Sequence, residues 1–178
     1  KNVNEVTDAH VEDVTRQLEA LIPVLEEISG APLDLGRLKE VVAFSCDCTE
    51  LWREVLETAT AIPAPLTFFD GTIHMGPAVV LRGTREAIDY YNVLLAELEQ
   101  RIRDGVGAVD EETSRIYWEG MPIWGRLRQH SELFIQLKAS VLASTYCSSW
   151  IFASFDGRDP IRSMAKAYLE LLIVRTDT

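Results

Sequence analysis

Apolar residues recur with helical spacing in three long stretches of the chain. The first spans residues 7–29 and is followed by Gly30, a residue type that commonly ends helices in the left-handed conformation. The second spans residues 34–58, and the third spans residues 84–105. The pattern therefore predicts three long helices. Because a short Gly-Ala-Pro segment joins the first two, we expect these to pack as an antiparallel pair.

The segment between the second and third helices shows no single periodicity. The run IPAPLTFFDGTIHMGPAVVLRG, which starts at Ile62, contains three prolines and three glycines among apolar residues. Proline and glycine interrupt regular elements, and short apolar runs fit either state. Two short strands and a series of short helical turns are therefore both compatible with this segment.

Beyond residue 110 the pattern changes to alternating strands and helices. The expected elements, in chain order, are a strand, a helix, a second strand and a last helix over residues 115–118, 123–137, 140–145 and 160–174. Such alternation is typical of crossover units in which the strands lie parallel in one sheet. The sequence thus predicts an α/β fold class, with long helices followed by a strand-helix-strand-helix unit.

This α/β unit is expected to be an incomplete domain. Sheets generally need about three or more strands to be stable by themselves, and only two are predicted here. The first residue is Lys1, and the chain stops just after a predicted helix. We therefore expect the sequence to be a piece of a larger α/β protein, with further chain or a partner covering the edge of the sheet.

Composition excludes several classes of partner. Hydrophobic residues make up 47% of the chain, as in a globular domain, and the formal net charge is −11. Because such a chain repels phosphate backbones, we expect no nucleic-acid partner. No apolar run approaches the length of a membrane span, so no membrane partner is expected either. Three cysteines form no obvious disulfide framework, which favours a reducing cytoplasm.

Candidate site residues follow the two predicted strands directly. In open α/β sheets, ligands bind outside the carboxyl ends of parallel strands. Glycine permits a sharp turn or close approach of a ligand, and hydroxyl and thiol groups offer polar contacts. The candidates are Glu119, Gly120 and Met121 after the first strand, and Thr145, Tyr146, Cys147, Ser148 and Ser149 after the second. An ordinary strand-to-helix turn explains the same residues equally well, and no catalytic residue is assigned.

Metal binding by this chain is not predicted. On a helix, Cys46 and Cys48 would point about 200° apart, so that they could not readily hold one ion. His10, His74 and His130 show no metal-ligand spacing. The sequence contains neither a P-loop nor a G-x-G-x-x-G motif. We therefore expect no metal or nucleotide cofactor in this part of the protein.

Four longer runs together resemble one enzyme family. The runs are RIYWEGMPIWGRL, LFIQLKASVLASTYCSSW, LEALIPVLEEISGAPLDLGRLKEVV and RGTREAIDYYNVLLAELEQRI. The succession of apolar residues, glycines and aromatic residues in these runs resembles the central portion of subunits of 2-hydroxyacyl-CoA dehydratases and benzoyl-CoA reductases. This family is of the 2-hydroxyglutaryl-CoA dehydratase D-component type. The resemblance extends over nearly all of the chain.

The resemblance implies a fold and an activity. Such enzymes have two homologous subunits built from flavodoxin-like lobes, and cysteines of each subunit hold an iron–sulfur cluster. A separate ATP-dependent activator delivers a low-potential electron, and the acyl-CoA substrate is reduced to a ketyl-type radical. Applied here, the resemblance implies a mainly helical region over residues 1–110 and the start of a flavodoxin-like lobe over residues 111–178.

The chain departs from the family pattern in its cysteines. The family's cluster ligands lie mainly before residue 1 and after residue 178, and Cys46 and Cys48 match none of them. A ligand role for Cys147 stays open. We therefore expect no cluster and no activity in this chain alone, with the candidate residues facing the acyl-CoA or the cluster in the parent enzyme. The alternative is a non-enzymatic helical interaction module in which the α/β part is only a scaffold.

Overall fold

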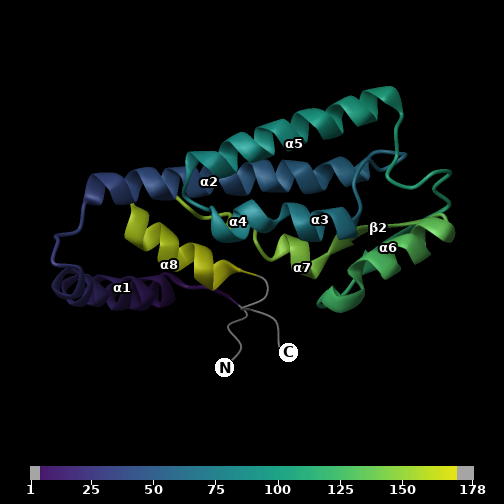
Figure 1. Cartoon of the computed structure of the whole chain (residues 1–178). Helices are drawn as coiled ribbons and strands as arrows, with labels where there is room; N and C mark the ends of the chain where they lie inside the picture. Colours follow the sequence, from purple (N-terminus) through teal and green to yellow (C-terminus); the bar gives the residue numbers. More distant parts are fainter. Residues whose placement is uncertain (1–4, 172–178) are drawn as a thin grey trace. The chain divides into compact units, whose positions relative to one another are not determined.

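The computed structural model describes residues 5–171 of the chain. These residues form two compact units, one from the described parts of residues 1–47 and 152–178, the other from residues 48–151. The helix α2 (Leu35–Glu57) contributes its beginning to the first unit and its end to the second. Figure 1 shows the elements coloured along the chain.

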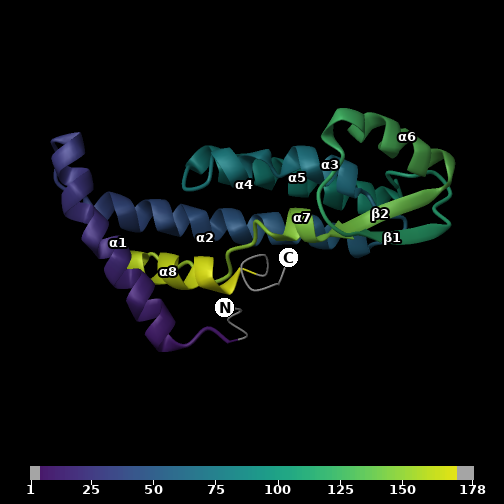
Figure 2. The same cartoon turned by 90° about the horizontal axis from the view of Figure 1, so that it is seen from below.

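The first unit is built around α1 (Asp8–Ser29) and α8 (Pro160–Glu170). Thr7 caps the beginning of α1, because its side chain accepts a hydrogen bond from the His10 amide. The helix ends at Gly30 with φ 69°, as the glycine signal predicted. Figures 1 and 2 both show α8 beside α1, and an ion pair of 3.0 Å joins Arg162 to Asp8.

The predicted antiparallel pairing of the first two helices is wrong. The main partner of α1 is α8, from the other end of the chain, and α2 makes few contacts with α1. A groove of about 530 Å³ lies between the end of α1, the following loop and the beginning of α2. In this groove region Leu25 and Ile28 stay 58% and 77% exposed. Helical periodicity revealed an apolar face on each helix but could not reveal which face it meets.

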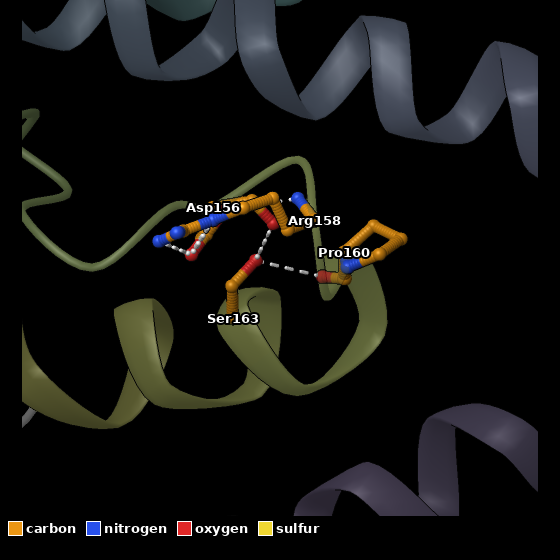
Figure 3. A network of polar contacts seen from close by, with 4 residues as sticks. All are labelled: Asp156, Arg158, Pro160 and Ser163. Atoms are coloured by element: carbon orange, nitrogen blue, oxygen red, sulfur yellow. Dashed lines mark hydrogen bonds and ion pairs between the residues drawn. The ribbon is translucent and has the colours of Figure 1, made fainter.

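A polar network joins the loop before α8 to the first turn of that helix (Figure 3). The Ser163 hydroxyl donates to the carbonyl oxygens of Asp156 and Pro160, both at 3.0 Å. The Arg158 guanidinium donates to the Asp156 carboxylate, and these hydrogen bonds lower the pKa of Asp156 to about 2. Between them, Gly157 lies so close to α2 that an added Cβ would stand 2.8 Å from the Lys39 carbonyl oxygen. Only glycine permits this approach without a shift of the backbone.

The second unit contains the remaining elements. After the end of α2 these are η1 (Thr58–Thr60), α3 (Phe68–His74), α4 (Gly76–Val80), α5 (Arg85–Asp104), β1 (Ser114–Trp118), η2 (Trp124–Arg126), α6 (Leu127–Gln136), β2 (Ala139–Ser144) and α7 (Thr145–Ser148). The ambiguous segment between the second and third long helices thus adopts helical turns. Thr67 caps α3 reciprocally with Asp70, which favours a helix over a strand at this point.

The two strands pair in parallel, as predicted. The register runs from Ser114 opposite Ala139 to Trp118 opposite Ser144, with one irregularity between Ile116 and Tyr117. Figure 2 shows α6 over one face of the pair. The α/β class and the incomplete domain are therefore confirmed. Of the predicted last helix, residues 172–174 lie outside the described residues.

Trp52 and Tyr91 form the centre of the core of the second unit. Both are fully buried, and their rings stand 5.4 Å apart. The Trp52 indole nitrogen donates to the Cys147 carbonyl at 3.0 Å, which ties α2 to α7. The Tyr91 hydroxyl accepts from the Ala78 amide and donates to the His74 carbonyl, both at 2.9 Å. Each polar atom of these two aromatic residues therefore has a partner, as burial requires.

A nearly buried carboxylate secures the beginning of β1. Glu112 has a side chain only 5% exposed and accepts from Arg115 at 2.6 Å and from the Ala64 amide at 3.4 Å. Arg115 in turn donates to the carbonyl of Ala59 at 2.5 Å. Burial alone would raise the pKa of Glu112. The hydrogen bonds from the Arg115 guanidinium and the Ala64 amide, together with the positive charge of Arg115, outweigh burial and hold that pKa below its ordinary value of 4.5.

Replacing Glu112 by glutamine should make the free energy of unfolding depend less on pH in the acidic range. A folded pKa below the unfolded one means that the carboxylate stabilises the fold above the ordinary pKa of 4.5 and loses this effect as pH falls through the lowered value. We expect Glu112→Gln to cost about 1–3 kcal/mol at pH 7 and progressively less in acid. Urea unfolding at several pH values measures this. Glu111→Gln, at an exposed ion pair, is the control, and parallel curves for both variants would refute the assignment.

Candidate active-site rim

The two candidate segments lie side by side at the carboxyl ends of β1 and β2. The last paired residues are Trp118 and Ser144, and each candidate segment starts at the next position. Thr145 joins the two segments directly. Its hydroxyl accepts from the Gly120 amide at 3.3 Å and donates to the Glu119 carboxylate at 3.0 Å. The predicted juxtaposition is therefore confirmed, and we call residues 119–121 and 145–149 the rim.

Gly120 makes the turn after β1 possible. Its φ is 86°, in the left-handed region that favours glycine. The indole of Trp118 donates to the Met121 carbonyl at 3.3 Å across this turn. The sharp turn predicted from the Glu-Gly sequence is thus present, and it brings the Gly120 amide toward the second segment.

Substitution of Thr145 by valine should loosen the rim. Valine keeps the shape of threonine but cannot make the two hydrogen bonds to Glu119 and Gly120, so we expect a loss of about 1 kcal/mol in the free energy of unfolding. Hydrogen exchange of the Gly120 amide should also become faster. Thr145→Ser, which keeps the hydroxyl, is the matched control. Equal exchange in the valine and serine variants would contradict the bridging role.

The second segment forms the short helix α7, which the sequence did not predict. Ser144 caps it, because its hydroxyl accepts from the Cys147 amide at 3.0 Å. The Ser148 hydroxyl donates to the Ser144 carbonyl at 3.0 Å, and the Ser149 hydroxyl donates to the Thr145 carbonyl at 2.6 Å. Both serine hydroxyls use their protons within the helix and retain oxygen lone pairs as acceptors.

Cys147 is a buried thiol at the centre of α7. It is 3% exposed, and an added Cβ on Gly71 would stand 3.4 Å from its sulfur. Burial raises the pKa of Cys147, against a smaller opposing effect of the hydrogen bond with Ser144. The thiol therefore stays protonated near neutral pH, which disfavours nucleophilic and metal-binding roles.

Trp118, which precedes the rim, and Tyr146, which belongs to it, pack against different aromatic residues. Trp118 stacks on Phe68 at 5.3 Å, whereas Tyr146 meets Trp124 edge-on at 6.1 Å. The carboxylate of Glu119 accepts hydrogen bonds from the hydroxyl groups of Thr145 and Tyr117. The hydrogen bond to Glu119 is the largest contribution to the raised pKa of Tyr117. Glu119 is thus held by the hydroxyl groups of Tyr117 on β1 and Thr145 at the beginning of α7.

A cavity of about 320 Å³ lies against β2 and α7. Apolar residues supply much of its wall, namely Leu56, Leu66, Phe68, Leu142 and Ile151. Ser144, Cys147 and Ser148 line the part that follows β2. Of the predicted site residues, Cys147 and Ser148 face this cavity, and the other six belong to the rim outside it. Tyr117, Leu142 and Ser144 also line the cavity and were not among the predicted site residues. For Tyr117 a signal was present, because alternation along a strand places its side chain on the face opposite to that of Trp118.

The lining of this cavity has no net charge. Among the described residues that line it, the charged side chains are Arg53 and Glu57. These two form an ion pair of 3.2 Å, and Arg53 also pairs with Glu50. A cavity with an apolar wall, acceptor hydroxyls and an internally paired cation suits a neutral, apolar group.

The cysteines do not form an iron–sulfur site within residues 5–171. No group of three or more His, Cys, Asp or Glu side chains is placed to hold a metal in this part of the chain. Cys48 is fully buried in the core on the continuous helix α2, and burial raises the pKa of its thiol. Cys147 lies in the cavity wall without a second cysteine beside it. The residues present therefore do not fit a cluster.

None of the helices within residues 5–171 combines the length and apolar character needed to cross a bilayer.

Comparison with known proteins identifies the family. The model of the 2-hydroxyglutaryl-CoA dehydratase D-component family matches residues 2–176. One of the subunits of the benzoyl-CoA reductase of Thauera aromatica is 38% identical over 75% of this chain and 33% of its own length. The alpha subunit of the (R)-phenyllactyl-CoA dehydratase of Clostridium sporogenes is 30% identical over 83% of this chain and 36% of its own length. The alpha subunit of the (R)-2-hydroxyglutaryl-CoA dehydratase of Acidaminococcus fermentans is 32% identical over 80% of this chain and 29% of its own length.

These comparisons agree with the resemblance noted in the sequence, and the chain spans about a third of the length of the three relatives. Because the family model covers nearly all of the chain, the chain belongs to the 2-hydroxyglutaryl-CoA dehydratase D-component family.

Proposed function

We propose that the chain is part of a subunit of an enzyme that acts on acyl-CoA thioesters by low-potential electron transfer, of the benzoyl-CoA reductase or 2-hydroxyacyl-CoA dehydratase type. In this proposal the cavity beside α7 holds the acyl group. The observation that carries it is the neutral, apolar cavity at the carboxyl end of β2. Family membership supports the thioester, because the relatives are named for acyl-CoA substrates.

Each part of the site has a distinct role in this proposal. The wall formed by Leu56, Leu142 and Ile151 excludes water from the acyl group. The rim residues Glu119, Gly120, Met121, Thr145, Tyr146 and Ser149 line the approach and contact the thioester end or the CoA chain. Cys147 and Ser148 contact the acyl group itself. The protonated thiol of Cys147 contributes packing and a weak hydrogen-bond donor.

Electron delivery in this proposal comes from outside the described residues. An iron–sulfur cluster of the parent subunit would supply the low-potential electron, after reduction by an ATP-dependent activator. Because no group of three or more potential metal ligands occurs within residues 5–171, the proposal assigns the cluster's ligands mainly to other parts of the parent. The role of this chain is to bind and orient the thioester and to keep water from it.

The proposal includes a second homologous subunit and a cytoplasmic location. The relatives are named as subunits, which supports a partner. Three free cysteines support a reducing compartment. The division into a helical region over residues 1–110 and a flavodoxin-like lobe starting at residue 111 stays a prediction for the parent subunit.

Anaerobic purification of the full-length parent with its second subunit tests this function. The expected result is stoichiometric iron and acid-labile sulfide, together with turnover of an acyl-CoA when the ATP-dependent activator and a low-potential reductant are supplied. Iron should be absent from the 178-residue chain prepared in the same way. A parent without iron and without thioester turnover would overturn the proposal and favour the non-enzymatic interaction module.

A further inference from the structure

A second hollow lies along one face of α5, within the second unit. Its volume is about 520 Å³, and His74 at the end of α3 closes one side. The α5 residues that line it are Glu86, Asp89, Tyr90, Val93, Leu94 and Glu97. Their spacing of three or four residues places them on one stripe of about three turns, roughly 16 Å long. We call this hollow the α5 groove.

The floor of the α5 groove is apolar and open to solvent. Val93 is 71% exposed and Tyr90 is 40% exposed, whereas Leu94 beside them is buried in the core. Single exposed apolar side chains are ordinary, but here they share a concave surface. An apolar side chain of a partner would remove both from water.

The α5 groove is held in shape by hydrogen bonds. The His74 ring nitrogen Nδ1 and the Tyr90 hydroxyl lie 2.7 Å apart, and the buried Tyr91 hydroxyl donates to the His74 carbonyl at 2.9 Å. Burial is the main cause that lowers the pKa of His74, so its ring is neutral near pH 7. The groove is therefore preformed, and His74 does not offset its acids.

The border of the α5 groove is acidic. Glu86 and Asp89 have no hydrogen bond or ion pair with any residue that the structure describes. Glu97 pairs with Arg101 at 2.5 Å, one turn further along α5. Two unpaired carboxylates thus stand beside the exposed Val93 and Tyr90. Such a surface is complementary to a segment that carries both apolar and basic side chains.

We propose that the α5 groove docks a basic, amphipathic segment of the second subunit. The inference rests on the proposed function in one respect, namely that the parent works with a second subunit. An apolar side chain of that segment enters between Tyr90 and Val93, and Lys or Arg side chains meet Glu86 and Asp89. Aromatic anchors with a polar border are the usual anatomy of such interfaces.

A second copy of this chain does not suit the α5 groove. In a two-fold symmetric dimer the same patch meets itself, so Glu86 and Asp89 would face their own copies. The chain also carries a net charge of −11, which disfavours self-association through an acidic surface.

Site-specific photocrosslinking of the intact complex tests the docking. The full-length subunit carrying p-benzoylphenylalanine in place of Val93 is co-expressed with its second subunit, irradiated and analysed by peptide mass spectrometry. The expected product is a crosslink to one peptide of the second subunit that contains Lys or Arg beside apolar residues. Asn92 carries the same probe in the control, because it is exposed on α5 and does not line the groove.

Charge reversal provides a second, independent arm. Asp89→Lys should weaken association of the two full-length subunits by about ten-fold at low salt, and the difference should shrink as salt rises. Glu99→Lys is the matched control, an exposed acid on α5 outside the groove whose partner Arg103 stands at 3.8 Å. Thermal unfolding of each variant subunit shows whether folding is intact.

These experiments decide whether the second subunit docks in the α5 groove, and their results are distinguishable from a failure of the proposed enzyme function. A crosslink from position 93 to the same polypeptide or to a second copy, or none above the Asn92 control, overturns the docking. So does equal association of the Asp89 and Glu99 variants. Because thioester binding is measured separately, its failure would overturn the acyl-CoA site without producing any of these results.

Discussion

Replacing Trp52 by phenylalanine is expected to lower the free energy of unfolding by about 2–4 kcal/mol. Trp52 is fully buried, and its indole nitrogen is the donor to the Cys147 carbonyl at 3.0 Å. Phenylalanine leaves that carbonyl without its partner and opens a cavity beside Tyr91. The damage should reach the rim, because this hydrogen bond ties α7 to α2.

Urea unfolding of the 178-residue chain and hydrogen exchange of the α7 amides measure both effects. Trp124→Phe is the control, since Trp124 is 48% exposed and contributes an aromatic contact with Tyr146. We expect this control to change the unfolding free energy by about 0.5 kcal/mol or less. Equal losses in the two variants, or unchanged α7 exchange in Trp52→Phe, would show that the Trp52 hydrogen bond does not position the rim.

Filling the cavity should strongly weaken thioester binding and leave the fold intact. Leu142 lies on β2 and lines the cavity, so tryptophan at this position would occupy space that the acyl group needs. In the full-length parent we expect Leu142→Trp to weaken binding of benzoyl-CoA by about 100-fold, while binding of free CoA changes little.

Leu133→Trp is the matched control for this variant, because Leu133 is 47% exposed on α6 and does not line the cavity. It should bind benzoyl-CoA as the unaltered parent does. Circular dichroism and thermal unfolding show whether Leu142→Trp is folded. If a folded Leu142→Trp parent binds the thioester with unchanged affinity, the acyl group lies elsewhere.

Local patterns were sufficient for most elements of the fold. The helical spacing of apolar residues was sufficient for α1, α2 and α5, and Gly30 and Gly105 marked the ends of α1 and α5, since these signals act within a few turns. The alternation after residue 110 gave the parallel pairing of β1 and β2. The turns of α3 and α4 were left open because prolines and glycines obscure periodicity. The packing of α1 against α8 was missed because it joins distant segments, which a local pattern does not encode.

The position of the candidate site was predictable from the sequence, but the predicted set of residues was incomplete. Topology alone placed Glu119 to Met121 beside Thr145 to Ser149, because both segments follow parallel strands. The sequence did not indicate that Cys147 and Ser148 face a cavity closed by Leu56 from α2. That wall comes from a helix far earlier in the chain, so its contribution depends on tertiary packing. Tyr117, by contrast, was within reach of a local pattern, because alternation along β1 places it on the face opposite to Trp118.

The most direct test of the proposed site compares three ligands by isothermal titration calorimetry with the full-length parent. The cavity has an apolar wall, and Arg53, its cation, is already paired with Glu57 and Glu50. Benzoyl-CoA should therefore bind at least about ten-fold more tightly than free CoA. 2-Hydroxyglutaryl-CoA, whose acyl group ends in a carboxylate, should gain little over free CoA, because burying an unpaired charge is unfavourable. Equal affinities for benzoyl-CoA and free CoA, or a preference for the carboxylate thioester that survives Leu142→Trp, would contradict a neutral acyl cavity beside α7.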